Sequence, residues 1–413
     1  MSSSSILNNA AHILKLVQSG TPADQALRES LTQDRHFTAP AERRGISRAV
    51  FTYYRWWRWL SEDDSLQKQL AAALALQERF DQNPASVKPA ALASCAIPDW
   101  LKAEMDFPGT TPVGAVAPNG PRALESKRPY PAEIAFLQQL QREPTLWIRV
   151  KQGLEQKVTS ALGNCTPAKF LAPRSPLPAY SYTGLTDLYR TPEFQAGEFE
   201  IQDLASQLVG HACAPQPGET WWDAGAGEGG KTMHLSDLMQ NKGLVWASDR
   251  SLRRLAKLKE RAARAKVFNF RAAPWEGGTQ LPTKTKFDGI LVDAPCTGIG
   301  TWQRNPHARW TTLPKDVHEL AAVQLQLLNH VVGSLRPGGR LVYSVCTLTR
   351  AETTGVAAAF TAAHPELEPI SALASTVAGV ADPGPGSASP ATTTLWPHEL
   401  NANGMFIAAW RKR

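Results

Sequence analysis

Residues 219–232 read ETWWDAGAGEGGKT, and this stretch decides the fold of the surrounding half of the chain. A short apolar run ends in Asp223, and a helical pattern opens at Lys231. Between them stand Gly225, Gly227, Gly229 and Gly230. Glycine permits a tight turn and lets a ligand approach the backbone closely. The stretch therefore predicts a strand, a turn and a helix that hold a nucleotide of unspecified type, although a purely structural turn has the same pattern.

Strand and helix patterns alternate along residues 199–413. The runs that predict strands are 219–223, 244–248, 267–270, 287–293, 340–345 and 404–410. Helical periodicity runs from Leu252 to Ala265 and from Val317 to Leu335. This alternation is typical of a doubly wound, parallel α/β sheet, which binds ligands at the carboxyl ends of its strands. We predict a Rossmann-like fold for this region.

Reactive side chains follow several of these predicted strands. Asp249 closes the second strand, where an acid can hold the ribose hydroxyls of an adenosine cofactor. Asp293 and Cys296 follow the fourth strand, and Cys346 follows the fifth. Because parallel strands bring their carboxyl ends to one edge of a sheet, we expect these groups to meet in one cleft. The other cysteines are interpreted as small buried apolar residues, namely Cys95, Cys165 and Cys213.

The N-terminal part of the chain is predicted to be helical, because Ile13, Leu14 and Val17 recur at helical spacing. Residues 41–60 combine arginines with aromatic residues. In one interpretation this is an RNA-binding helix, with arginines on phosphates and aromatics available for stacking. In the other, the aromatic stripe packs into a core and the arginines are merely solvated. We favour the core for the aromatics and leave both interpretations open for the arginines.

Composition divides the chain into four predicted parts. Residues 1–104 form a helical domain, and residues 105–131 form a linker rich in proline and glycine. Residues 132–198 form a small α+β module, and residues 199–413 form the Rossmann-like domain. Residues 371–394 are rich in small residues and proline, which predicts a flexible insertion before the last strand.

Bulk composition narrows the class of protein. Of the 413 residues, 43% are hydrophobic and 20% are charged, as in a globular protein. A formal net charge of +7 suits a polyanionic partner. Five cysteines form an odd set without a CxxC pair, which disfavours a disulfide framework or a structural zinc site. We therefore expect a cytoplasmic monomer with no metal, no signal peptide and no membrane span.

Several stretches together resemble the cytosine-C5 RNA methyltransferases of the Sun/NOL1/NOP2 group, especially the bacterial type that modifies small-subunit ribosomal RNA. Four of them lie in the predicted Rossmann-like domain besides the glycine turn: FEIQDLASQLVG, DAPCTGIGTWQRNPHARW, LRPGGRLVYSVCTLTRAE and NGMFIAAWRK. The N-terminal AERRGISRAVFTYYRWWRWL resembles a helical domain related to an antitermination factor. PDWL and PTLWIRV resemble the family's small RNA-recognition module. The resemblance implies that residues 1–104 are a helical RNA-binding domain and that residues 132–198 are the RNA-recognition module.

The resemblance implies an S-adenosylmethionine-dependent enzyme that methylates cytosine C5 in RNA, most often ribosomal RNA. Carried over by motif, Cys346 adds to cytosine C6, and Cys296 assists removal of the C5 proton. Asp293 hydrogen-bonds the cytosine, and Lys231 lowers the thiol pKa or orients the base. We assign cofactor contacts to Gly225, Ala226, Gly227, Glu228, Gly229, Gly230, Lys231, Asp249, Arg254, Ala273 and Asp293. We assign RNA contacts to Arg43, Arg44, Arg48, Arg149 and Arg304.

The chain departs from the family pattern at a few positions. Ala273 and Pro274 stand near the place of an acid that touches the adenine side of the cofactor, and His307 stands where aspartate is common. His307 as a catalytic base is a minor alternative to a surface or structural histidine. Three rival functions stay open: the same chemistry on transfer RNA, a catalytically silent RNA-binding or ribosome-assembly factor, and a nicotinamide oxidoreductase.

Overall fold

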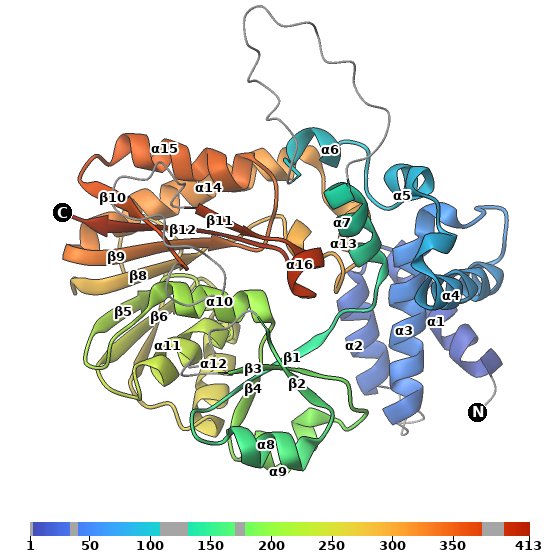
Figure 1. The fold of residues 1–413 in the computed structure, drawn as a ribbon, viewed down its shortest axis with the longest axis horizontal. Coiled ribbons are helices and arrows are strands. Elements are labelled where there is room, and N and C mark those ends of the chain that lie inside the picture. The colour runs from blue at the N-terminus through green and yellow to red at the C-terminus, as the bar shows by residue number, and fades with distance from the viewer. Residues whose placement is uncertain (1–2, 34–39, 108–130, 170–177, 374–391) are drawn as a thin grey trace, which may run out of the picture. The chain divides into compact units, whose positions relative to one another are not determined.

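The computed structural model describes residues 3–33, 40–107, 131–169, 178–373 and 392–413 (Figure 1). They form two compact units. Unit 1 comprises Met1–Pro144 and Thr301–Leu313, and unit 2 comprises Thr145–Gly300 and Pro314–Arg413. Most of the predicted linker 105–131 and of the predicted insertion 371–394 lies outside the described residues.

Unit 1 is helical, which confirms the prediction of an all-α N-terminal region. Its helices are α1 (Ser3–Gln18), α2 (Ala23–Gln33), α3 (Pro40–Trp56), α4 (Leu66–Gln82), α5 (Pro89–Cys95), α6 (Leu101–Glu104), α7 (Pro131–Gln141) and α13 (Ala308–Thr311). Ile13, Leu14 and Val17 are buried together with the aromatic residues Tyr53 and Tyr54. The aromatic stripe of α3 is thus chiefly core, as expected.

The segment Thr301–Leu313 belongs to unit 1 although its neighbours in sequence belong to unit 2. Arg309 explains why, because its side chain is fully buried there. Its guanidinium donates to the backbone carbonyls of Ala96, at 3.2 Å, and of Leu140. These carbonyls lie at the carboxyl ends of α5 and α7, where the helix dipoles favour a cation. A charged side chain therefore secures this segment without a carboxylate partner among those contacts.

Unit 2 contains a sheet of eight strands in the order β10-β12-β9-β8-β5-β6-β7, with β11 paired to β12 (Figure 1). The strands are β5 (Thr220–Asp223), β6 (Leu244–Asp249), β7 (Phe270–Pro274), β8 (Phe287–Asp293), β9 (Leu335–Val345), β10 (Leu367–Ile370), β11 (Thr392–Leu395) and β12 (Met405–Lys412). β5 to β9 pair in parallel, whereas β10, β11 and β12 pair antiparallel. The strands that follow β5 in the chain are added first on one side of it, as β6 and β7, and then on the other side, as β8 and β9. Doubly wound sheets bind ligands at such a switch point.

Helices cover both faces of this sheet (Figure 1). They are α10 (Leu204–Cys213), α11 (Gly230–Leu238) and α12 (Leu252–Arg264) on one face, and α14 (Pro314–Val331) and α15 (Val356–Ala363) on the other. Trp221 and Trp222 are consecutive in β5, and each is buried in a different one of the two apolar clusters. Because side chains alternate along a strand, such a sheet needs apolar residues at both positions. The predicted Rossmann-like fold is confirmed.

Some predicted strand boundaries were wrong. The third strand was expected at 267–270 but runs from Phe270 to Pro274, because Val267 packs into the cluster beneath α12. β9 begins at Leu335, five residues earlier than expected, since Phe287 of β8 pairs with it there. The strands β10 and β11 were not predicted. Among the described residues, no helix is both long enough and apolar enough to cross a membrane.

A smaller antiparallel sheet precedes the large one in unit 2. Its strands, in the order β2-β3-β1-β4, are β1 (Leu146–Val150), β2 (Cys165–Pro167), β3 (Ala179–Tyr182) and β4 (Phe199–Ile201), with α8 (Glu155–Leu162), a short helix α9 (Pro192–Gln195) and a core around Ile148, Val158 and Phe199. The predicted module was given residues 132–198, but α7 is part of unit 1 and β4 extends the small sheet to Ile201. A short helix, α16 (Pro397–Leu400), precedes β12.

Candidate active site

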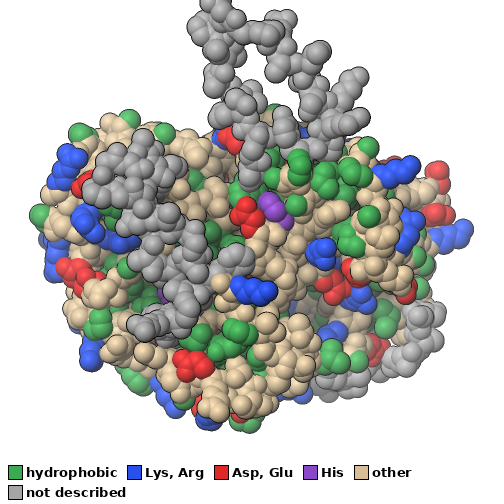
Figure 2. Space-filling model, viewed as in Figure 1, with side chains coloured by type: hydrophobic (Ala, Val, Ile, Leu, Met, Phe, Trp, Pro, Cys, Tyr) green, Lys and Arg blue, Asp and Glu red, His purple; other side chains and the backbone are tan. Residues whose placement is uncertain are grey.

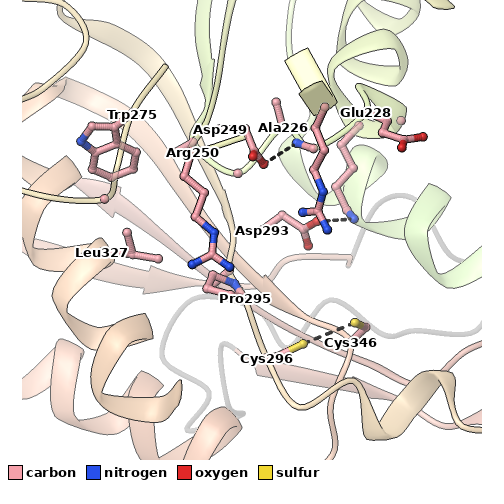
Figure 3. Close-up of a pocket in the computed structure, with 18 of the residues that line it drawn as sticks. Ala226, Glu228, Asp249, Arg250, Trp275, Asp293, Pro295, Cys296, Leu327 and Cys346 are labelled. Atoms are coloured by element: carbon pink, nitrogen blue, oxygen red, sulfur yellow. Dashed lines mark hydrogen bonds and ion pairs between the residues drawn. The ribbon is translucent and has the colours of Figure 1, made fainter. Parts of the chain in front are cut away.

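A cavity of about 460 Å³ lies at the carboxyl ends of the parallel strands of unit 2 (Figure 3). The loops after β5, β6, β7, β8 and β9 all contribute to its lining. Trp275, Val323 and Leu327 supply apolar surface, while Lys231, Asp249 and Asp293 supply charge. A cavity with apolar walls and a few converging polar groups is typical of a small-molecule or cofactor site.

The glycine turn after β5 is shaped for close approach. Gly227 and Gly229 have φ angles of +53° and +87°, a region that favours glycine. A Cβ at Gly225 would lie 2.3 Å from the carbonyl oxygen of Asp293, so two strand ends can approach only because that residue is glycine. A Cβ at Gly227 or Gly230 would meet no atom within 4 Å, and both residues line the cavity. The turn therefore leaves open space for a ligand beside its backbone.

Asp249 ends β6 and is held against the glycine turn. Its Oδ2 accepts from the backbone N–H of Gly227 at 3.0 Å, and its Oδ1 accepts from that of Ser251 at 2.8 Å (Figure 3). Ser251 in turn caps α12. Each carboxylate oxygen retains a second acceptor site. The arrangement can therefore accept hydrogen bonds from two vicinal hydroxyls.

A cation and an acid meet at the centre of the cavity. Lys231 Nζ lies 2.7 Å from Asp293 Oδ2, and Ser344 Oγ donates to Asp293 Oδ1 at 2.7 Å. Burial opposes the charge on Lys231, but Asp293, Cys346 and Asp223 outweigh burial and raise the pKa of the ammonium group. Lys231 is therefore a fixed positive charge at neutral pH.

The two cysteines lie next to each other, although 50 positions separate them in sequence. Cys296 Sγ and Cys346 Sγ are 3.3 Å apart, and both residues are half-buried on the cavity wall (Figure 3). The hydrogen bond with Cys346, followed by burial, raises the pKa of the Cys296 thiol. Either sulfur can donate the hydrogen bond that joins the two thiols.

A buried carboxylate, Glu352, joins the two cysteine loops. It lies in the π-helical turn Ala351–Gly355 and is fully buried. Its oxygens accept from the Thr297 N–H at 2.9 Å and hydroxyl at 2.6 Å, and from the Thr347 hydroxyl at 3.0 Å. Thr349 and Gln324 also donate to it, at 2.9 and 3.1 Å. Because Thr297 follows Cys296 and Thr347 follows Cys346, this carboxylate sets the relative position of the two thiols.

Comparison with known proteins finds relatives of the part of the chain that forms most of unit 2. Residues 211–411 match the family described as "16S rRNA methyltransferase RsmB/F". The "Probable ribosomal RNA small subunit methyltransferase B" of Bacillus subtilis is 36% identical over 53% of this chain and 49% of that protein. The mouse "tRNA (cytosine(72)-C(5))-methyltransferase NSUN6" is 37% identical over 40% of this chain and 37% of that protein. The chain thus spans about half the length of the first of these relatives.

Residues 211–411, slightly less than half of the chain, thus resemble the RsmB/F methyltransferase family. This confirms the resemblance to the Sun/NOL1/NOP2 group. The solved structure of PH0851 covers 98% of this chain and 98% of its own, at a TM-score of 0.73 and 21% identity. That of NSun6 from Pyrococcus horikoshii with SFG covers 67% of this chain and 93% of its own, at a TM-score of 0.56 and 22% identity. At these identities the two structures support the fold alone.

The loop after β7, the strand that was predicted third in this domain, differs from the prediction. Ala273 lies inside β7 and does not line the cavity. The strand is displaced towards the carboxyl end of the chain, so the residues that reach the cavity are Trp275, Glu276 and Gly277. Glu276 is thus an acid of this loop that lines the cavity. Pro274, which ends the strand, is the sequence signal that would have placed this loop correctly.

The other predicted cofactor residues are distributed as follows. The cavity lining includes Gly225, Ala226, Gly227, Glu228, Gly230, Lys231, Asp249, Arg254 and Asp293, but not Gly229. A Cβ at Gly229 would instead lie 2.6 Å from the side chain of Leu258, so this glycine serves the packing of α12. Arg250 was not predicted, yet it lines the cavity and extends towards Pro295 (Figure 3).

The predicted RNA contacts have different surroundings. Arg43 and Arg44 are exposed on α3 of unit 1, and Arg304 is exposed in the segment Thr301–Leu313. Arg48 is exposed too, but pairs with Glu143 and, at 3.7 Å, with Asp81. Arg149 was wrongly assigned to RNA. It is buried in β1, where it pairs with Asp237 and donates to Gln202 at 2.8 Å.

His307 lies in unit 1, immediately before α13. Its ring is 4.7 Å from that of Tyr54, in an edge-to-face contact. Burial lowers the pKa of the imidazole, and the charge of Asp24 opposes this shift. These surroundings are those of a packed structural histidine, which was the interpretation preferred from the sequence.

Proposed function

We propose that this protein is an S-adenosylmethionine-dependent methyltransferase that acts on cytosine C5 in RNA, most often ribosomal RNA. One observation carries the proposal: two thiols 3.3 Å apart face a cavity that also holds a lysine–aspartate pair. A nicotinamide oxidoreductase explains the glycine turn and Asp249, but it leaves both thiols without a role. The resemblance of residues 211–411 to the RsmB/F family supports the same conclusion.

The residues of the cavity fit S-adenosylmethionine. The open space beside Gly227 and Gly230 suits an adenosyl ligand, and Asp249 can accept from its two ribose hydroxyls. Trp275 and Leu327 offer apolar surface to an adenine ring, and Glu276 offers an acceptor for its amino group. When bound, the cofactor supplies an electrophilic methyl group.

The chain's own residues act on the base. Cytosine C5 becomes nucleophilic when the Cys346 thiolate adds to C6, because the new S–C6 bond moves the electrons of the C5–C6 double bond towards C5. Lys231 and the thiol of Cys296 favour the thiolate form of Cys346, since a nearby cation and a hydrogen-bond donor both stabilise a negative charge. Asp293, fixed by Lys231 and Ser344, hydrogen-bonds the cytosine edge.

Release of the enzyme needs a second step. After C5 carries the methyl group, loss of the C5 proton restores the C5–C6 double bond, and the electron pair of the S–C6 bond returns to the Cys346 sulfur. Cys296 assists proton removal, directly or through water. The target base must be unstacked to reach the cavity, or must already lie in a single-stranded loop.

A transfer RNA substrate is the second candidate, because one relative is named for methylation of transfer RNA. The five cysteines form no disulfide, which fits a reducing compartment and favours the cytoplasm as the place of action.

The test uses three variants, Cys296→Ala, Cys346→Ala and the double replacement, incubated with S-adenosylmethionine and unmodified ribosomal or transfer RNA. Cys296→Ala is expected to form an RNase-sensitive adduct that survives a denaturing gel, because addition proceeds and elimination stalls. The adduct should vanish in the double variant. Cys346→Ala should form no adduct and transfer at least ~10³-fold less methyl, as expected when a nucleophile is removed. An adduct with Cys346→Ala and none with Cys296→Ala would show that Cys296 is the nucleophile and that Cys346 assists proton removal.

Absence of any adduct, together with absence of tritium transfer from labelled cofactor by the unmutated protein on either RNA, would contradict the enzyme proposal. The protein would then be a silent RNA-binding or ribosome-assembly factor.

A further inference from the structure

The positive charge of the chain is concentrated in one short stretch. Residues 250–271 contain nine lysines and arginines and one acid, Glu260. The whole chain contains 44 basic and 37 acidic residues, so the rest of it holds 35 and 36. Residues 1–104, the predicted RNA-binding domain, hold 12 basic and 11 acidic residues. A polyanion would therefore meet the strongest positive field at residues 250–271.

Helix α12 carries most of this charge on the side that faces water. Leu255, Leu258 and Ala262 are buried in the domain core, whereas Arg253, Lys257 and Lys259 are exposed. Arg253 and Lys257 are four residues apart on the helix, and like charges at this spacing destabilise a helix. A repulsive arrangement that the fold does not require points to an external partner.

Four of the nine cations have roles inside unit 2. Arg261 pairs with Glu200 of β4 at 3.2 Å, and Arg264 pairs with the same carboxylate. Arg250 and Arg254 line the cavity. The remaining five are exposed: Arg253, Lys257, Lys259, Lys266 and Arg271. Glu260, 3.0 Å from Lys257, is the one acid within the stretch, and both side chains are largely solvated.

An exposed aromatic residue lies at the far end of the same surface. Phe268, two residues after Lys266, has an exposed fraction of 76%. Single exposed apolar side chains are common on protein surfaces, but an aromatic ring beside cations is a surface on which a nucleic-acid base can stack. The helix is about 20 Å long at 1.5 Å per residue. Cations therefore extend from the cavity, where Arg254 lies, towards an exposed ring.

We propose that the α12 basic surface, defined as Arg253, Lys257, Lys259, Lys266, Arg271 and Phe268, binds the sugar-phosphate backbone and one base of the RNA that enters the neighbouring cavity. This inference rests on the proposed RNA substrate. A membrane is a poor alternative, because the apolar face of α12 is buried in the domain and cannot insert into lipid. On the face drawn in Figure 2, by comparison, Lys and Arg side chains are dispersed among Asp and Glu.

The experiment compares two triple variants of the full chain. Arg253→Gln/Lys257→Gln/Lys259→Gln removes three cations of the α12 basic surface. Lys169→Gln/Lys284→Gln/Lys315→Gln removes three exposed lysines elsewhere in unit 2 and is the matched control. Binding of single-stranded poly(U) is measured against salt concentration. For the first variant the slope of log K against log salt should fall by about 2, since each lost phosphate contact contributes about 0.7.

Phe268→Ala tests the stacking part of the surface separately. It should weaken poly(U) binding by roughly tenfold with an unchanged salt slope, because stacking releases no counterions. Equal slopes for the two triple variants, or no poly(U) binding by the unmutated protein, would overturn the proposal. So would binding of phosphatidylserine vesicles by the unmutated protein in place of RNA.

Methyl transfer distinguishes this inference from the proposed function. If the unmutated protein transfers methyl to RNA and the α12 triple variant does so with an unchanged KM for RNA, the proposal of RNA binding by the α12 basic surface is wrong and the proposed methyltransferase activity is supported. If the unmutated protein transfers no methyl but shows the predicted slopes, the proposed activity is wrong and RNA binding by the surface is supported. Cofactor affinity should be the same in all variants, because none of the replaced side chains lines the cavity.

Discussion

Two ion pairs in unit 2 have similar chemistry and different surroundings. Lys231 and Asp293 are 2.7 Å apart on the wall of the cavity, with side-chain exposed fractions of 13% and 26%. Arg149 and Asp237 pair beneath α10 and α11, with exposed fractions of 0% and 6%. The first pair faces open space that a substrate can enter. The second is enclosed by protein on all sides, so its charges can act only on the fold.

The enclosed pair has costly neighbours. His211 and His234 lie edge to face, 5.1 Å apart, and neither ring nitrogen of His234 has a hydrogen-bond partner among the described residues. Burial, then the charge of Arg149, lowers the pKa of His211 to about 4. Burying polar groups without full compensation costs free energy. A buried ion pair is therefore not by itself evidence of an active site. An ion pair that lines a cavity, as Lys231 and Asp293 do, is stronger evidence.

Removing one carboxylate from each pair tests directly whether the two ion pairs differ in role. Asp237→Asn should lower the free energy of unfolding by about 3–5 kcal/mol, because Arg149 would remain buried without a counter-charge. Asp293→Asn should cost less stability than Asp237→Asn, because the Lys231–Asp293 pair is more exposed, but it should lower methyl transfer by roughly 100-fold. Urea unfolding and kcat/KM are measured for both variants. Equal stability losses would show that the two pairs do not differ in role.

Glu352 combines features of both ion pairs. It is buried like Asp237, yet it holds the loops that carry the two cysteines of the cavity. Glu352→Ala should reduce kcat by roughly 100-fold and Glu352→Gln by roughly tenfold, since glutamine keeps the shape but only one acceptor oxygen. The KM for the cofactor should stay within about twofold in both. In a Cys296→Ala background, the rate of adduct formation should fall in the same order. A proportional loss of stability and rate in the two variants would make Glu352 merely structural.

The smallest expected effect is a pH dependence of stability that arises in the enclosed cluster. The folded pKa of His211 is depressed, so its contribution is present above the unfolded pKa of about 6.5 and is lost as the pH falls towards 4. Between pH 7 and pH 5 the loss from His211 should be about 2 kcal/mol. Asp223 has the opposite sign, since burial raises its pKa to about 6 and stabilises the fold at lower pH.

A double variant isolates the histidines from that opposing effect. His211→Gln/His234→Leu removes both imidazoles and leaves Asp223 in place. Its unfolding free energy should therefore decrease less between pH 7 and pH 5 than that of the unmutated protein, as measured by urea titration at each pH. An identical pH dependence in the two proteins would mean that the histidines do not control stability in this range.

Much of this protein follows from sequence alone. The glycine turn at 219–232 and the apolar runs predict the parallel sheet because periodicity and turn chemistry are local properties. Once the sheet is parallel, Asp249, Asp293, Cys296 and Cys346 must reach the same edge, and the structure lines one cavity with all four. The aromatic stripe of α3 was expected in the core for the same local reason.

Tertiary structure decided what sequence could not. The sequence-based interpretation assigned Arg149 to RNA and Lys231 to the active site, but the packing of β1 against α11 buries Arg149 beside Asp237, whereas Lys231 lies at the cavity. The register of β7 removed Ala273 from the site and introduced Glu276, because one strand boundary depends on how Val267 packs under α12. Glu352 joins two loops that are about 50 residues apart in sequence, which no local pattern can reveal. Long-range contacts, which depend on the whole fold, set these three outcomes.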